Sequence, residues 1–81
     1  MKLKGQTAIV TGGGRDIGAA CAMRLAAEGA NVAINYFASA EGAEGVVARI
    51  KDAGGDAFAM QGDLKDPAQV AALVEATVER F

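Results

Sequence analysis

The sequence predicts an α/β fold of the Rossmann type, with a parallel sheet and a single unit over residues 1–81. Short apolar runs alternate with segments whose apolar residues recur at helical spacing, which is typical of βαβ units. A glycine cluster separates the first apolar run from the first helical segment. This alternation gives the element order β-α-β-α-β-α. Two right-handed crossovers that move in the same direction then give the strand order 3-2-1. We expect the first half of a doubly wound domain, without a second domain.

Composition and charge exclude several classes of protein. A net charge of −2 offers no basic surface for nucleic acid, and no run of about 18 apolar residues exists to span a membrane. The single cysteine excludes an internal disulfide, and the lack of histidine leaves no usual metal cluster. Met1 to Gly5 are too short and polar for a signal peptide, so we expect a cytoplasmic protein.

The first βα unit follows from its apolar pattern. We predict a strand over Thr7 to Thr11 and a helix over Ile17 to Glu28, which Gly29 ends in a left-handed conformation. The expected apolar stripe of this helix comprises Ile17, Cys21 and Leu25, beside Ala22 and Ala26. Cys21 is therefore expected to be a small buried residue rather than a reactive thiol.

The second βα unit has the same organisation. A strand is predicted over Val32 to Tyr36 and a helix over Ala40 to Ala53, with Ser39 as its N-cap and Gly54-Gly55 after its end. The buried stripe of this helix is expected to be Ala43, Val46, Val47 and Ile50.

The third unit comprises a strand over Ala57 to Gln61 and a helix that begins after Asp66. Asp66 is the expected N-cap, Pro67 the first helical residue, and Gln69 stands where a capping box needs a polar side chain. The inner stripe is predicted as Val70, Leu73, Val74, Thr77 and Phe81.

This topology predicts where the helices lie. The first two belong on one face of the sheet and the last on the other, with the first strand at an open edge. Because parallel strands normally bury both faces, we expect a further strand to pair beside Thr7 to Thr11 in the complete fold.

The turn after the first strand is the expected functional site. Gly12, Gly13 and Gly14 lead into a helix start, where unpaired main-chain N–H groups and a partial positive charge favour an anion. Glycines without Cβ allow a diphosphate to approach these donors. The alternative is a tight strand-to-helix turn without a ligand.

The spacing Thr11-Gly12-x-x-x-Asp16-x-Gly18 resembles the T-G-x-x-x-G-x-G turn of short-chain dehydrogenases/reductases. That family has glycine where this chain has Asp16, whose carboxylate would repel a diphosphate. Arg15 would neutralise Asp16, or the Asp16 side chain would point to solvent and cap the helix.

The resemblance extends from Lys4 to Phe81 and includes NYFAS and GDL at the ends of the second and third strands. It is strongest to the subgroup of 3-oxoacyl-carrier-protein reductases. It implies that Thr11, Gly12 and Gly18 form the cofactor turn, with an Ile17 N–H near the diphosphate. It also implies that Asp63, with Leu64, binds the adenine amino group. The alternative for Asp63 is a simple turn residue.

The end of the second strand indicates NADP(H) rather than NAD. Sites that prefer NAD carry a carboxylate there for the ribose hydroxyls, whereas this chain has Asn35 and Tyr36. We expect Arg15 to pair with a 2′-phosphate, with neutral donors from Ser39 and the Asn35 amide. NAD is the less favoured alternative.

The resemblance implies that the whole enzyme transfers a hydride between the nicotinamide and a small carbonyl or alcohol substrate, commonly as a homotetramer. The serine, tyrosine and lysine that carry this reaction in the family have no counterpart in the 81 residues, so no catalytic residue is assigned. Alternatives are a stand-alone nucleotide-binding or regulatory module and half of an S-adenosylmethionine-dependent methyltransferase. The methyltransferase is disfavoured because Asn35-Tyr36 supplies no acid for the ribose.

Overall fold

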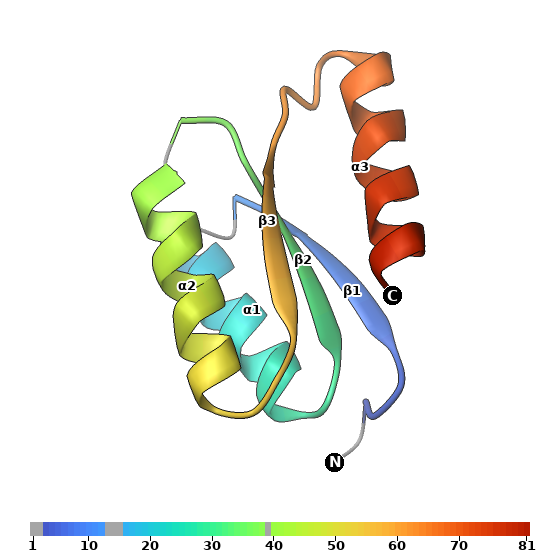
Figure 1. The fold of residues 1–81 in the computed structure, drawn as a ribbon. Coiled ribbons are helices and arrows are strands. Elements are labelled where there is room, and N and C mark those ends of the chain that lie inside the picture. Colours follow the sequence, from blue (N-terminus) through green and yellow to red (C-terminus); the bar gives the residue numbers. More distant parts are fainter. Residues whose placement is uncertain (1–2, 13–15, 39) are drawn as a thin grey trace.

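The protein forms a three-stranded parallel sheet between two layers of helices (Figure 1). The computed structural model describes residues 3–12, 16–38 and 40–81. Helices α1 and α2 lie on one face of the sheet and α3 on the other, as predicted. The elements, in chain order, are β1 (Thr7–Thr11), α1 (Asp16–Ala27), β2 (Asn31–Tyr36), α2 (Ala40–Asp52), β3 (Ala57–Gln61) and α3 (Pro67–Arg80).

The sheet has the order β1-β2-β3, which confirms the predicted 3-2-1 arrangement. All pairing is parallel, with Thr11 opposite Asn35 and Asn35 opposite Met60. The three carboxyl ends therefore meet at one edge of the sheet. The segment that follows each strand begins at this edge, where ligands bind in open α/β folds.

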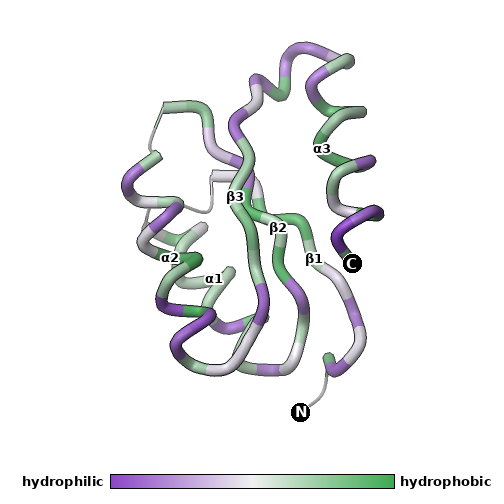
Figure 2. Tube along the Cα trace, viewed as in Figure 1, coloured by the Kyte–Doolittle hydropathy of each residue, from purple (hydrophilic) through white to green (hydrophobic). Residues whose placement is uncertain are grey.

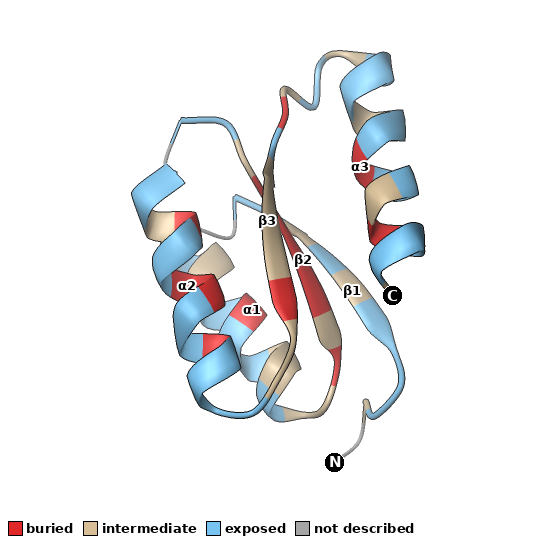
Figure 3. Cartoon of the chain, in the orientation of Figure 1, coloured by how far each residue is buried: buried red, intermediate tan, exposed pale blue. Residues whose placement is uncertain are grey.

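The core lies between the sheet and the first two helices (Figure 3). Strand β2 is buried along its length because it has a neighbour on each side and a helix layer on each face, and Val32 and Ile34 are fully buried. Figure 2 shows hydrophobic residues in the middle of β2 and β3 and hydrophilic residues toward their lower ends. The predicted stripe of α2 is confirmed, since these residues are buried: Ala43, Val46, Val47 and Ile50.

Helix α1 buries only part of the apolar stripe that was predicted for it. Ala22 is buried and Leu25 and Ala26 pack against the core, but Ile17 is 80% exposed and Cys21 is also exposed. The prediction that Ile17 and Cys21 are buried is therefore wrong. At about 100° per residue, the face that meets the sheet centres on Ala22 and Ala26. Cys21 lies to one side of that face, where no described element covers it because β1 is the edge strand.

Helix α3 begins as predicted. Asp66 has an extended conformation and its side chain accepts a hydrogen bond from the Ala68 N–H, with Pro67 next in the chain. Leu73 and Thr77 are buried, whereas Val74, expected on the inner stripe, is 46% exposed. This expectation is wrong because the buried side of α3 follows the line from Leu73 to Thr77, and Val74 lies about 100° away from Leu73.

The end of α3 is fastened to β3 by side chains. The rings of Phe58 and Phe81 lie 5.8 Å apart, and an Arg80 nitrogen lies 2.9 Å from an Asp56 oxygen. The Arg80 guanidinium also stands over both rings. Both charged groups of the ion pair are partly exposed, so it contributes little by itself.

Isoleucine truncations test this core. Ile34→Ala should lower the free energy of unfolding by about 2–5 kcal/mol, because it leaves a cavity around a fully buried side chain. The matched control Ile17→Ala removes the same atoms from a side chain that is 80% exposed, and should change stability by less than about 0.5 kcal/mol. Urea unfolding of both variants checks this, and equal losses would contradict the described core.

Candidate functional site

The junction between β1 and α1 begins with main chain that is open to solvent. The Gly12 N–H donates to the Asn35 carbonyl at 2.9 Å, so pairing with β2 continues one residue beyond β1. Gly12 has φ +65°, and a Cβ built there would meet nothing within 4 Å. Glycine is therefore required at position 12 by the backbone conformation, and the space beside it is open.

Three of the predicted site residues lie wholly outside the described residues. These are Gly14, Arg15 and Ser39, together with their neighbour Gly13. The backbone of Asp16 begins α1, but its side chain is not described, so both arrangements expected for Asp16 remain predictions.

The start of α1 presents main-chain donors at the same edge. The N–H groups of Ile17 and Gly18 fall in the first turn, where no carbonyl of the helix accepts from them. Ile17 is strongly exposed and Gly18 is half-buried. The helix dipole adds a partial positive charge here, so this end of α1 has the chemistry of an anion site.

The Asn35 side chain is turned into the protein. It is only 4% exposed, and its Nδ2 donates to the Gly62 carbonyl at 3.2 Å and to the Met60 carbonyl at 3.4 Å. The expected role of this amide as a donor to a 2′-phosphate is therefore wrong. A buried amide must satisfy its hydrogen bonds within the protein, and here the neighbouring strand supplies the acceptors. The sequence did offer a signal for this orientation, because Asn35 is a polar residue that directly follows an apolar run in the central strand.

The segment after β3 is closely tied to the end of β2. The Gly62 N–H donates to the Tyr36 carbonyl at 3.0 Å, and Gly62 is buried. Asp63 is half-buried, and its Oδ1 accepts from the Lys65 N–H at 2.9 Å. Asp63 thus fits the turn role considered for it, although that bond uses only one carboxylate oxygen. Leu64 is 46% exposed beside it.

The end of β2 has one aromatic residue packed inward and one outward. Tyr36 packs against the core, whereas Phe37 is 66% exposed. The Gln61 side chain holds this turn, since its Nε2 donates to the Phe37 carbonyl at 3.0 Å. Strand pairing thus brings together the predicted residues at the ends of all three strands.

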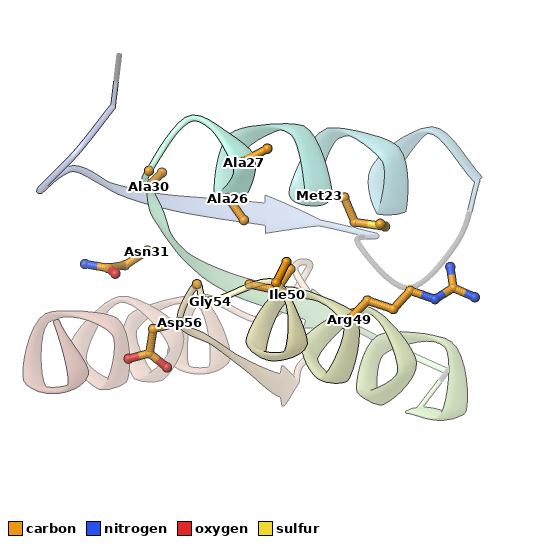
Figure 4. A pocket seen from close by; sticks show the side chains of 12 residues that line it. Met23, Ala26, Ala27, Ala30, Asn31, Arg49, Ile50, Gly54 and Asp56 are labelled. Atoms are coloured by element: carbon orange, nitrogen blue, oxygen red, sulfur yellow. The ribbon is translucent and has the colours of Figure 1, made fainter. Parts of the chain in front are cut away.

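A separate pocket lies at the opposite edge, where β2 and β3 begin. Its cavity of about 420 Å³ opens between the ends of α1 and α2, and Ala26 and Ile50 face each other across it (Figure 4). No residue in its lining was predicted as a site residue. The lining comprises Met23, Ala26, Ala27, Gly29, Ala30, Asn31, Arg49, Ile50, Ala53, Gly54, Gly55 and Asp56.

Neither a cluster of metal-ligating side chains nor a membrane-spanning helix occurs among the described residues. Within residues 3–12, 16–38 and 40–81, no three or more cysteine, aspartate or glutamate side chains gather as metal ligands. Over the same part of the chain, every helix is too short or too polar to cross a membrane.

Known proteins are similar to this chain in sequence and in fold. The family model for short chain dehydrogenases matches residues 6–81. A versicolorin reductase of Emericella nidulans is 49% identical over 80 residues. A 3-oxoacyl-acyl-carrier-protein reductase of Staphylococcus aureus is 46% identical over 76 residues, or 94% of this chain. A short chain dehydrogenase of Burkholderia cenocepacia, solved in complex with NADP, is 52% identical over the whole chain, with a TM-score of 0.96.

These proteins are longer than the present chain. The match with the versicolorin reductase covers 99% of this chain but 30% of that protein. The match with the Staphylococcus reductase covers 94% of this chain but 31% of that protein. For the Burkholderia structure, the matched part is 33% of that chain. The chain therefore spans about a third of the length of its relatives.

A pair of glycine substitutions tests the β1–α1 junction. Gly12→Ala should lower stability by about 1–2 kcal/mol, because a residue with Cβ is strained at φ +65° although nothing crowds it. Gly45→Ala, in α2 and equally uncrowded, should raise stability by about 0.5–1 kcal/mol. Urea unfolding distinguishes the two, and a stabilising Gly12→Ala would show that the junction has another conformation.

Proposed function

Because the chain belongs to the short-chain dehydrogenase family, we propose that it binds the adenosine and diphosphate end of NADP(H). The observation that carries the proposal is the junction of β1 and α1. There, Gly12 leaves open space beside the main chain, and the first turn of α1 offers N–H donors that no carbonyl within the helix accepts from. This donor set fits a diphosphate, which needs close main-chain approach and a partial positive charge.

The diphosphate would be held by main chain rather than by lysine. The N–H groups of Ile17 and Gly18 are the donors assigned to it, with Thr11 and Gly12 forming the floor of the turn. A helix N-terminus holds its donors in place before the anion arrives, so little reorganisation accompanies binding.

The adenine would lie over the segment after β3. Asp63 is assigned to the exocyclic amino group, because Oδ1 already accepts from the Lys65 N–H and Oδ2 can accept from a ligand. Leu64, almost half exposed, offers an apolar contact for the ring.

Preference for NADP(H) over NAD(H) rests on the end of β2. Neither Asn35 nor Tyr36 can repel a 2′-phosphate, and the Asn35 amide faces inward. Arg15 and Ser39 remain the groups proposed to bind that phosphate. The complex of the Burkholderia relative with NADP supports NADP(H) as the cofactor.

For the whole protein, we propose hydride transfer between the nicotinamide and a carbonyl or alcohol substrate. The bound cofactor would supply or accept the hydride. The residues of this chain would bind and orient the adenosine and diphosphate, and thereby set where the nicotinamide lies. The acid–base residues are proposed to lie outside these 81 residues.

Isothermal titration tests the cofactor preference. The protein should bind NADPH more tightly than NADH, because the extra phosphate gains a charge-assisted bond and meets no carboxylate at the end of β2. Tighter binding of NADH would overturn the preference.

Arginine substitutions localise the phosphate contact. Arg15→Ala should weaken NADPH binding by about 10- to 100-fold, which corresponds to the loss of a charged hydrogen bond, and change NADH binding much less. Arg49→Ala is the matched control, because Arg49 lines the pocket at the opposite edge and should affect neither ligand. Equal losses of both ligands in Arg15→Ala would remove Arg15 from the 2′-phosphate site.

A further inference from the structure

The side chain of Gln69 joins the start of α3 to the segment after β3. Its Oε1 accepts from the Asp63 N–H at 2.6 Å, and its Nε2 donates to Asp66 Oδ2 at 3.1 Å. In a capping box, the side chain of the third helical residue accepts a hydrogen bond from the N–H of the N-cap residue. Here Gln69 reaches three residues further back, because the Asp66 N–H already donates to the Asp63 carbonyl.

A second set of bonds holds the same segment from the side of β2. The buried Asn35 amide donates to the Gly62 carbonyl, and the Gly62 N–H donates to the Tyr36 carbonyl. A Cβ built on Gly62 would lie 3.4 Å from Asn35 Nδ2 and 3.7 Å from Gln69 Oε1. Gly62 is thus packed between the two amide side chains.

Asp63 lies where these two sets of bonds meet. The peptide group before it is held by Asn35 through the Gly62 carbonyl and by Gln69 through the Asp63 N–H. The Lys65 N–H then fixes one oxygen of its carboxylate. Without these bonds, the segment between β3 and α3 would sample several orientations, and a ligand would have to order it on binding.

We propose that Gln69 is a positioning residue for adenine recognition. It fixes the main chain at Asp63, and thereby the position of the Asp63 carboxylate. Asn35 holds the same peptide group from the opposite side. This inference rests on the proposed function, since it assumes that Asp63 accepts from the adenine amino group. Gln69 itself does not touch the base. Its contribution is the orientation of Asp63 Oδ2, and therefore the discrimination between adenine and bases without that amino group.

The test compares two cofactors in the protein and its variants. NADPH carries the amino group, and its hypoxanthine analogue carries a carbonyl oxygen at that position, which Asp63 would repel. The wild type should prefer NADPH. Gln69→Ala should weaken NADPH binding by about fivefold to tenfold, with little change for the analogue, so that the preference falls by the same factor.

Two further variants separate positioning from general stability. Ala72 lies on the exposed side of α3, away from the segment after β3. Ala72→Gly weakens the helix, but the preference for NADPH over the analogue should be retained. In an Asp63→Ala background, Gln69→Ala should cause no further loss of preference, because its effect passes through Asp63. Circular dichroism of each variant monitors folding.

The outcomes distinguish this inference from the function on which it rests. A wild type that fails to bind NADPH would overturn both. A wild type that binds NADPH without preferring it to the analogue would overturn the assignment of Asp63 to adenine, and the positioning role with it. A preference that is present in the wild type but survives Gln69→Ala would overturn the positioning role alone. An equal effect of Ala72→Gly and Gln69→Ala would also contradict it, since the effect would then reflect helix stability.

Discussion

The arrangement depends on the parallel pairing of β2 between β1 and β3. Because both neighbours run in the same direction as β2, Thr11 lies opposite Asn35 and Tyr36 opposite Gln61. All three strands then end at one edge, and three separate connections begin there. The buried side chains of β2, Val32 and Ile34 among them, keep this register, because a shift of one residue would turn them to the other face. The position of the site is thus a consequence of the core.

Local signals predicted most of the fold. The bounds of β1 and β3, the stripe of α2 and the N-cap Asp66 were predicted correctly, since each depends on neighbours within one turn or one strand. The strand order followed from the handedness of crossovers. The glycine turn was proposed as a site because its glycines precede a helix start, and this stays a prediction. The positive φ of Gly12 agrees with such a turn.

Features that depend on distant neighbours could not be predicted from the sequence. The exposure of Cys21 depends on which side of α1 faces the open edge of the sheet. The inward turn of Asn35 depends on carbonyls 25 and 27 residues away, at Met60 and Gly62. Gln69 was expected to cap its own helix, yet its oxygen accepts from Asp63. In each case tertiary packing selected one of several orientations that the local sequence allowed.

The central claim is that main-chain donors where β1 meets α1 bind the cofactor diphosphate. The most direct test is a nuclear magnetic resonance titration of the protein with NADP, in which each backbone amide is followed separately. We expect the largest shifts at Gly12, Ile17 and Gly18, with further shifts from Gly62 to Leu64. Shifts confined to the pocket at the other edge, around Ala26 and Ile50, with Gly12 to Gly18 unchanged, would contradict it.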